Sequence, residues 1–411
     1  MPKRALSQSP KELVDGPPAK TRRLDPESGA ELPFPNTKVT FLRPPPPFQK
    51  PMPISSFSYD KSRALRFDNS SMRYYAAPPI GAQLSYGYNR WVRRPEEKGR
   101  LDGLLTAFSR AKKDNKVNLA DVGVVSWRGV MTKILTSPYE ERDGWELNVM
   151  LEHGTLYLEE HTSDEKVEEK NNIEPRHRTQ MYYGYAFESY GTSDTPYRGQ
   201  TSTSAEPPCW GGDVDTNVQW CSVVRTKLGD TRLLIGGEVD CVREKYTGTT
   251  DSFVELKTSM TIRSAQDNAR FEKKLLKFYF QSFLLGVPEI VVGFRTPRGE
   301  VKEVQSFKTT QLPRLVRGKA GAWDPSMCLD WGCQFISFLK ESVVEEKGTV
   351  WRVKFVPGNG VRLVKLDETL VEEVVGKEDR VGFLPRWYWD ELTESANVTE
   401  TGGSNLYILN G

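Results

Sequence analysis

The chain has 411 residues, of which 37% are apolar and 27% charged, a composition typical of one large globular domain or two modest ones. Its formal net charge is only +2, which excludes a broad basic field, so any nucleic-acid contact must be a local groove. The five cysteines show no C-x-x-C spacing, which favours free thiols in a reducing compartment without structural zinc. No apolar run reaches the length of a membrane span, and no signal-peptide core is expected.

The first 36 residues are rich in proline, serine and charge, and they contain few large apolar side chains. Such a segment cannot bury enough surface to offset the entropy of ordering, so we predict a disordered tail over residues 1–36. Its basic clusters, at 3–4 and 20–23, are of the kind found in nuclear localisation signals. We predict one folded domain over 37–392 and a loose polar tail over 393–411.

The next elements follow from apolar spacing. Residues 71–75 read as extended, 101–113 as a helix with apolar positions 101, 104, 105 and 108, and 122–130, 145–151 and 155–158 as strands. Arg128 then stands inside an apolar strand and needs an anionic partner. A guanidinium suits phosphate as well as carboxylate, so a phosphate clamp and a core salt bridge both remain open.

Residues 162–180 are charged and predicted to form a loop. An aromatic run over 182–187 follows and ends in Glu188, a carboxylate in apolar company that calls for a cation. The stretch 189–213 is read as a long polar excursion, and residues 219–225 as a strand leading to the centre of the site.

The central stretch is residues 237–242, followed by 254–257, and we predict two strands joined by a polar hairpin connection. Side chains alternate across a strand, so Glu238 and Asp240 share one face, and Glu255 and Lys257 share a face of the next strand. One lysine does not balance three carboxylates, whereas a hard divalent cation does. The alternative is a surface hairpin with an ordinary ion pair, but the acids alternate with apolar residues, which favours the metal site.

The second half predicts helices over 264–285 and 324–344, strands over 287–295 and 300–307, and a hairpin over 349–356 and 360–366. Gln281 lies on the apolar face of the first helix, so we expect a buried, hydrogen-bonded amide. The pattern as a whole predicts an α+β fold with mixed β-sheets flanked by helices.

The E-x-D and E-x-K pair resembles the PD-(D/E)XK nuclease core. Five motifs also occur in the order typical of the decapping exoribonuclease (DXO) family: Trp127-Arg128-Gly129, Gly184–Glu188, Glu238-Val239-Asp240, Glu255-Leu256-Lys257 and Gln281–Val287. This resemblance covers roughly residues 37–390. The proline-rich entry and basic tail are similar to the fungal nuclear branch, whose members bind and stabilise the nuclear 5′→3′ exoribonuclease.

The resemblance implies a nuclear, metal-dependent hydrolase of RNA 5′ ends. Its substrates would be triphosphate ends, incompletely methylated caps and NAD caps, and its product RNA with a 5′-monophosphate. The implied ligands of Mg²⁺ or Mn²⁺ are Glu188, Glu238, Asp240, Glu255 and the carbonyl of Leu256, and the catalytic set is the four acids with Lys257. The implied substrate contacts are Trp127, Arg128, Gly129, Cys221, Glu238, Lys257 and Gln281, with Arg73 as a weaker match.

Two other functions remain open from the sequence. One is a non-catalytic partner that only stabilises the exoribonuclease, for which an intact acidic set is unnecessary. The other is a DNA endonuclease of the same core fold, against which the near-neutral charge argues.

Overall fold

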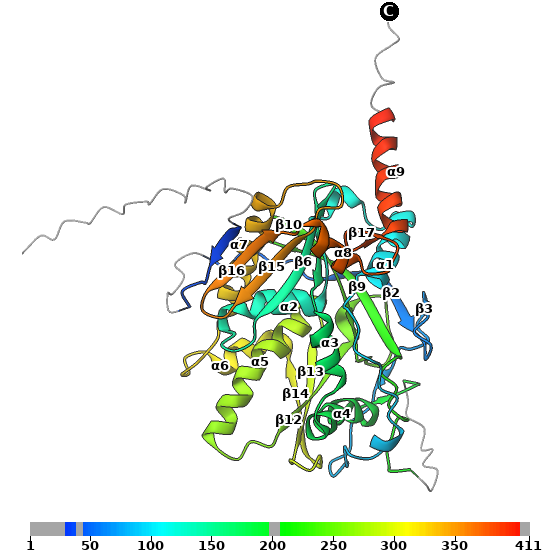
Figure 1. Cartoon of the computed structure of the whole chain (residues 1–411). Helices are drawn as coiled ribbons and strands as arrows, with labels where there is room; N and C mark the ends of the chain where they lie inside the picture. Colours follow the sequence, from blue (N-terminus) through cyan, green and yellow to red (C-terminus); the bar gives the residue numbers. More distant parts are fainter. Residues whose placement is uncertain (1–28, 38–43, 197–205, 403–411) are drawn as a thin grey trace, which may run out of the picture.

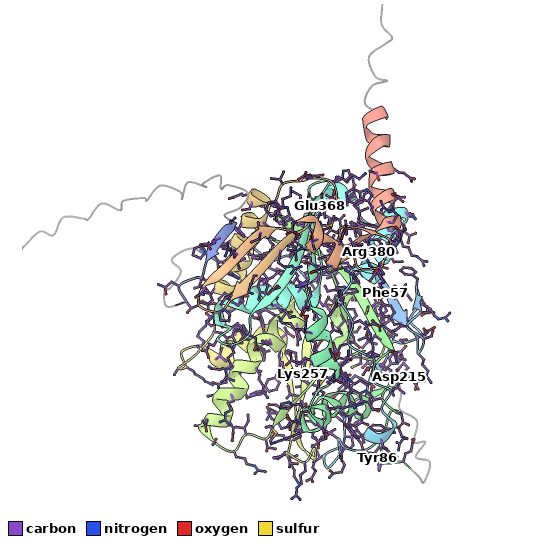
Figure 2. The ribbon with its side chains drawn as sticks, viewed as in Figure 1. Phe57, Tyr86, Asp215, Lys257, Glu368 and Arg380 are labelled. Atoms are coloured by element: carbon purple, nitrogen blue, oxygen red, sulfur yellow. The ribbon has the colours of Figure 1, made fainter. Side chains whose placement is uncertain are left out.

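The computed structural model describes residues 29–37, 44–196 and 206–402, with side chains described up to residue 394. Two mixed β-sheets form the body and helices cover their faces, as the sequence predicts (Figure 1). No helix in these ranges is long and apolar enough to cross a membrane. Side chains fill the space around both sheets, with Asp215 and Lys257 in the lower half of the view and Glu368 and Arg380 in the upper half (Figure 2).

The larger sheet has ten strands in the order β1-β16-β15-β6-β7-β5-β10-β9-β2-β3. Neighbours pair antiparallel except that β5 runs parallel to both β7 and β10. Its strands are β1 (Ala30–Pro33), β2 (Met52–Tyr59), β3 (Leu65–Arg66), β5 (Val124–Trp127), β6 (Trp145–Glu152), β7 (Thr155–Glu160), β9 (Gln219–Leu228), β10 (Thr231–Glu238), β15 (Trp351–Val356) and β16 (Gly360–Lys365).

The smaller sheet has six strands in the order β14-β13-β12-β11-β4-β8. Strand β11 pairs antiparallel with β12 through Cys241 and Val242, so the predicted hairpin is confirmed only over these two residues, and β12 runs parallel to β13. Its strands are β4 (Tyr74–Tyr75), β8 (Thr192–Ser193), β11 (Cys241–Val242), β12 (Phe253–Met260), β13 (Glu289–Arg295) and β14 (Val301–Lys308), and a separate pair joins β17 (Arg380–Val381) to β18 (Leu384–Pro385).

The helices begin and end at recognisable signals. In α5 the Ser264 hydroxyl accepts a hydrogen bond from the Asp267 N–H at 3.1 Å, and Gly286 ends the helix in the left-handed conformation at φ 71°. The α-helices are α1 (Asp102–Lys113), α2 (Arg128–Thr136), α3 (Asp164–Asn171), α4 (Pro175–Tyr190), α5 (Ala265–Leu285), α6 (Leu312–Val316), α7 (Pro325–Ser342), α8 (Glu368–Val375) and α9 (Arg386–Gly402).

Strand alternation divides the core between the two faces of the large sheet. In β10, Leu233 and Ile235 pack into the cluster that contains α2, α5 and α7, whereas Leu234 packs into the cluster that contains α1 and α9. A third cluster joins α4 to the small sheet. There Gly293 of β13 leaves room for the ring of Phe187, because a Cβ at position 293 would lie 2.3 Å from that ring. Helix α4 therefore sits close to the strands that carry the acidic motifs.

The predicted strand over 122–130 is wrong at its end. Strand β5 stops at Trp127, and Arg128 is the first residue of helix α2 instead of lying inside a strand. The buried positions Val130, Met131, Ile134 and Leu135 have the spacing of a helix face, and that pattern prevails over the apolar run before it.

The predicted loop over 162–180 is also wrong, because α3 and the first turns of α4 occupy most of it. Helix α3 buries none of its residues, so it leaves no apolar period in the sequence, and it is marked only by its Ser163 cap. The Pro at the start of α4 is a helix-starting signal of the same kind.

The two ends of the domain extend further than predicted. Residues 30–33, placed in the tail, form β1 and pair with β16. Helix α9 continues through residues 393–402, which were expected to be loose. The rest of the predicted tails, residues 1–28 and 403–411, lies outside the described residues.

Candidate active site

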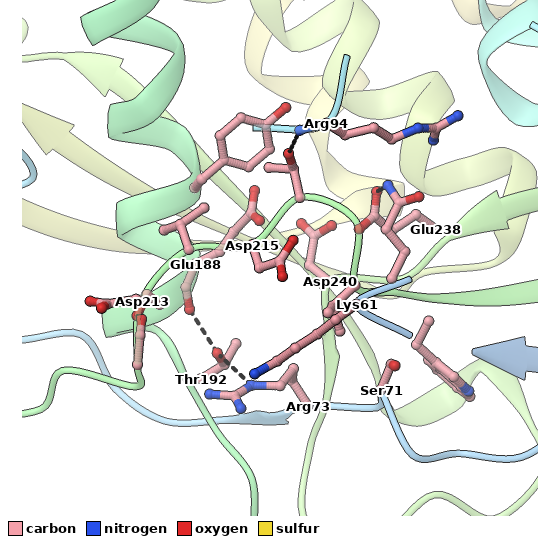
Figure 3. Close-up of a pocket in the computed structure, with 18 of the residues that line it drawn as sticks. Lys61, Ser71, Arg73, Arg94, Glu188, Thr192, Asp213, Asp215, Glu238 and Asp240 are labelled. Atoms are coloured by element: carbon pink, nitrogen blue, oxygen red, sulfur yellow. Dashed lines mark hydrogen bonds between the residues drawn. The ribbon is translucent and has the colours of Figure 1, made fainter. Parts of the chain in front are cut away.

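A cleft of about 750 Å³ opens where the two sheets meet, and carboxylates and cations line it together. The acids include Glu188, Glu238 and Asp240, which lie up to 52 positions apart in the sequence. Figure 3 shows Glu188 and Asp240 directed into the same space, with Arg73 on its other side. The structure therefore brings these three predicted acids together at one cleft.

Glu238 and Asp240 sit at the crossover between the sheets. The predicted continuous strand over 237–242 breaks there: Glu238 ends β10 in the large sheet, and β11 begins at Cys241 in the small one. Each acid is fixed by one donor. The Gln219 side chain donates to Glu238 Oε2 at 2.8 Å, and the Leu256 N–H donates to Asp240 Oδ2 at 2.7 Å.

Glu188 reaches the cleft from the last turn of α4. It is half-buried and stands beside aromatic residues that anchor the helix in the third core cluster. Its backbone carbonyl accepts a hydrogen bond from the Thr192 hydroxyl at 2.8 Å, so the helix end is tied to β8.

Glu255 lies behind the cleft and is 0% exposed. Two cations share it: Arg128 Nη1 donates to Oε2 at 2.9 Å, and Lys257 Nζ donates to Oε1 at 2.5 Å. Lys257 Nζ also lies 3.9 Å from Asp240 Oδ2. Lys257 therefore links the buried ion pair to the acids of the cleft.

Burial and mutual repulsion shift the pKa values of the cleft acids upward. Burial, followed by the charges of Asp240 and Glu238, raises the pKa of Glu188 well above its usual value. Burial and then the charge of Glu255 raise the pKa of Asp240 to about 7. Burial also raises the pKa of Glu238, with Arg128 opposing the shift. Lys257 and Arg128 offset the burial and repulsion of these three carboxylates only in part.

Glu255 has the opposite balance. Burial opposes its ionisation, but the charges of Arg128 and Lys257 outweigh that cost and lower the pKa of Glu255 to about 2. Burial likewise opposes charge on Lys257, yet Glu255 and Asp240 raise the pKa of its ammonium. In this arrangement Lys257 is therefore a positively charged hydrogen-bond donor.

The donor chemistry of the cleft fits a hard divalent cation, because Glu188, Glu238 and Asp240 are carboxylates that repel one another there. Within the described ranges, however, no three Asp, Glu, His or Cys side chains are gathered closely enough to hold a metal ion. Glu255 is turned to Arg128 and Lys257 instead. Metal ligation by Glu188, Glu238, Asp240, Glu255 and Leu256 stays a prediction.

Four of the predicted substrate contacts lie at two places. Arg73 lines the cleft and donates to the carbonyl of Gly211 at 2.8 Å and to Asp194. Trp127, Arg128 and Gly129 lie together at the β5–α2 junction, where Gly129 is exposed and a Cβ there would meet nothing within 4 Å.

Two further predicted contacts differ in burial. Cys221 of β9 is 4% exposed and pairs across the ladder with Glu238. Gln281 of α5 is half-buried, so the expectation of a buried amide is wrong. The two positions before it, Tyr279 and Phe280, take the buried face of the helix.

Sequence reasoning missed several charged residues of the cleft wall. Lys61, Arg93 and Arg94 line it from the segment between β2 and α1, and Asp213 and Asp215 line it from the stretch read as a polar excursion and the residues just after it. The Asp-x-Asp spacing of 213–215 was the one available signal. The three cations stand in coil segments with no periodic pattern, so only the tertiary fold brings them to the acids.

The chain is similar to known RNA-processing nucleases over most of its length. A family model described as "RAI1 like PD-(D/E)XK nuclease" matches residues 49–389. The decapping nuclease RAI1 of Mycosarcoma maydis is 36% identical, with 85% of this chain and 89% of the relative covered. The human decapping and exoribonuclease protein is 34% identical, with 88% and 90% covered.

Solved structures agree with these relatives. The Rai1 of Scheffersomyces stipitis superposes with a TM-score of 0.73 at 26% identity and covers 84% of this chain and 97% of that one. A structure of that protein holds (3′-NADP)⁺ and a calcium ion, at 25% identity and the same TM-score, with 85% and 96% covered. The S. pombe Rai1 in complex with 3′-FADP gives a TM-score of 0.67 at 26% identity, with 82% and 100% covered.

The match covers both acidic motifs, the α4 motif and the sheets that carry them, and the curated relatives are decapping nucleases. This chain therefore belongs to the RAI1-like PD-(D/E)XK nuclease family and is a hydrolase that acts on RNA.

Proposed function

We propose that the chain trims RNA 5′ ends to a 5′-monophosphate. It would release pyrophosphate from triphosphate ends, the cap dinucleotide from incompletely methylated caps, and NAD from NAD-capped ends. One observation carries the proposal: a single cleft holds the Glu188, Glu238 and Asp240 carboxylates together with the Arg73 guanidinium and the Lys61 ammonium. Acids of this kind suit a divalent cation and cations of this kind suit phosphate oxygens.

The four acids and the carbonyl of Leu256 would hold Mg²⁺ or Mn²⁺. When bound, such an ion lowers the pKa of a water ligand and neutralises phosphate oxygens. Leu256 suits the task because its N–H already fixes Asp240, so the strand and the acid are held in one arrangement.

Lys257 would supply charge and a proton donor at the reacting phosphate. Its ammonium lies between Glu255 and Asp240, and the raised pKa keeps it charged at neutral pH. A fixed ammonium here orients the attacking water and stabilises the negative charge that develops on phosphorus-bound oxygens. Arg128, behind it, holds Glu255 in place and would bind phosphate through its second nitrogen.

The small ligands of the relatives support the dinucleotide cap substrates. Rai1 proteins from two organisms were solved with (3′-NADP)⁺ and 3′-FADP, which are dinucleotides joined through a pyrophosphate. An NAD-capped RNA begins with the same linkage, and the cleft of about 750 Å³ has the size of a site for a dinucleotide.

We also propose a nuclear location and association with the nuclear 5′→3′ exoribonuclease, which would degrade the 5′-monophosphate product. The active cleft must stay open to RNA, so the partner surface lies elsewhere. Residues 287–315 are the candidate: β14 is the edge strand of the small sheet, bonded to residues 81–82 only at its first residue, Val301, and Leu315 of α6 is 41% exposed.

The deciding experiment is hydrolysis of 5′-triphosphate RNA by the purified chain with Mn²⁺, with Mg²⁺ and with EDTA. We expect pyrophosphate release with either ion, none with EDTA and none from Asp240→Asn. Asp230→Asn, in the exposed β9–β10 turn, is the matched control and should keep full activity. Activity that survives both EDTA and Asp240→Asn would refute the metal site.

The same experiment separates the two alternatives. Absence of hydrolysis by the wild-type chain, together with binding to the exoribonuclease, would favour a purely stabilising partner. Cleavage of duplex DNA in preference to RNA would favour the endonuclease.

A further inference from the structure

A second groove, of about 490 Å³, runs beside strand β2 outside the acidic cleft. We call it the β2 groove and define it by residues 52–56 together with Phe67, Arg110, Lys116, Arg225 and Tyr246. Sheet register places it relative to the active site. Phe57 pairs with Cys221, which pairs with Glu238, while Met52 pairs with Arg225. The groove therefore begins next to the rung of Glu238 and runs along β2 for roughly 13 Å, at about 3.3 Å per residue.

The groove is cationic. It contains three cations, Arg110, Lys116 and Arg225, against one carboxylate, that of Asp114. Lys116 makes an exposed pair with Asp114 at 3.5 Å, a contact that contributes little. Arg110 and Arg225 are exposed, and neither pairs with an acid within the described part of the chain. Unpaired guanidinium groups lining a hollow fit phosphate oxygens.

Aromatic faces accompany these cations. The Arg110 guanidinium lies 4.4 Å from the centroid of the Phe67 ring, a cation–π contact that helps to position it at the groove. Tyr246 packs edge to face on Trp220 at 5.1 Å, and Trp220 lines the acidic cleft. The Trp220–Tyr246 pair is thus the ridge between the two hollows. Cations that follow a backbone, together with rings on which bases stack, are the features of a single-strand site.

A peptide strand fits this edge poorly. Strand β3 pairs only with Ser58 and Tyr59, so the β2 edge is open over the groove. Pro53 has no N–H to donate, however, and the ladder with β9 shifts register between Pro53 and Ser55. Proline and irregular register both disfavour strand addition.

We infer that the β2 groove binds the single-stranded RNA that follows the 5′ nucleotide held in the acidic cleft. This inference rests on the proposed function. Phosphate groups of this RNA would contact Arg110 and Arg225, and one of its bases would stack near Tyr246. A long RNA would therefore bind more tightly than a short one, although the atoms that react in the acidic cleft are the same.

The test compares two substrates with the same 5′ end, a triphosphorylated dinucleotide and a long unstructured RNA. In the variant Arg110→Ala/Arg225→Ala we expect KM for the long RNA to rise roughly tenfold or more, because two charge-assisted contacts are lost. The dependence of log KM on log salt should flatten by about 1.4, or about 0.7 for each phosphate contact. The dinucleotide should be hydrolysed as by the wild type. Arg314→Ala/Arg317→Ala, at α6 on the other side of the molecule, is the matched control and should change neither substrate (Figure 1).

Two results would overturn the inference: unchanged KM for the long RNA, or an equal loss for both substrates, which would mean damage to the cleft itself. Direct binding keeps the question separate from catalysis. Fluorescence anisotropy of the long RNA in EDTA should show weaker binding by the double variant even if no hydrolysis is found. Competition by duplex RNA as effective as that by single strands would also overturn the single-strand assignment.

Discussion

Without metal, the ionised Asp240 carboxylate in the acidic cleft lowers the folding stability of the protein, and a substitution at this position measures by how much. Its pKa rises from 3.8 to about 7, so the folded chain holds a proton there more tightly than the unfolded chain does. The ionised carboxylate therefore destabilises the fold. The penalty is absent below the unfolded pKa, grows as the pH rises from about 4 to about 7, and is complete above that. We expect Asp240→Asn to stabilise the protein in EDTA at pH above 7.

The magnitude follows from the shift. Three pKa units correspond to about 4 kcal/mol at most. Asn keeps an oxygen for the Leu256 N–H but binds it more weakly, and repulsion is shared with Glu188, so about 1 to 2 kcal/mol is the expected gain. Added Mn²⁺ should reverse the order: at a hundredfold excess over Kd the wild type gains about 2.7 kcal/mol, and Asp240→Asn gains far less.

The assay is chemical denaturation at several pH values, with EDTA and then with Mn²⁺. Asp215→Asn is the matched control, because Asp215 lines the same cleft but accepts two hydrogen bonds from Asn217, at 3.0 and 2.9 Å. It should not stabilise the protein. A loss of stability in Asp240→Asn at high pH in EDTA, or a gain that does not shrink as the pH falls, would refute the reasoning.

Three more outcomes are expected. Arg128→Lys should lower turnover per folded molecule, because lysine lacks the planar guanidinium that grips two phosphate oxygens. Thermal stability should change little, because lysine keeps the positive charge beside Glu255. A large fall in stability with normal turnover would make Arg128 purely structural. Glu152→Gln should stabilise the protein against denaturation near pH 8, and this gain should disappear towards pH 4. The reason is that burial, followed by the charge of Glu345, raises the pKa of the Glu152 carboxyl to about 8; the residue is 5% exposed. Leu315→Glu should weaken co-purification with the nuclear exoribonuclease and spare triphosphate hydrolysis; the reverse pattern would place the partner surface elsewhere.

Local sequence patterns were enough to predict an element when all its start, interior and end signals lie within its own segment. Helix α5 was predicted almost to the residue, because its serine cap, its unbroken interior and its terminal glycine all act within one segment. The β15–β16 hairpin was predicted for the same reason. Helix α3 was missed because it buries none of its residues and so has no apolar face that would repeat in the sequence. The start of α2 was missed because the apolar run of β5 continues into the buried face of that helix.

The site itself was predictable only in part, because its acids lie on or beside strands whereas several of its cations lie in coil. Glu238, Asp240 and Glu255 lie on consecutive strands or directly beside them, so they could be grouped from their spacing in the sequence. Lys61, Arg93 and Arg94 come from coil that lines the cleft, and their position depends on long-range packing that no local pattern encodes.

The break between β10 and β11 explains why the acidic pair stands where it does. A continuous strand would keep Glu238 and Asp240 in one sheet, with an adjacent strand on each side of both residues. In the structure the chain leaves the large sheet after Glu238 and joins the small one at Cys241, so the two acids line the seam between the sheets. Sheet hydrogen bonds fix the backbone on either side, while the seam leaves the carboxylates open to the cleft. The alternation of acidic and apolar residues over 237–242 therefore marks a junction between two sheets and not one strand. This junction gives the acids a rigid backbone and an open cleft among apolar residues.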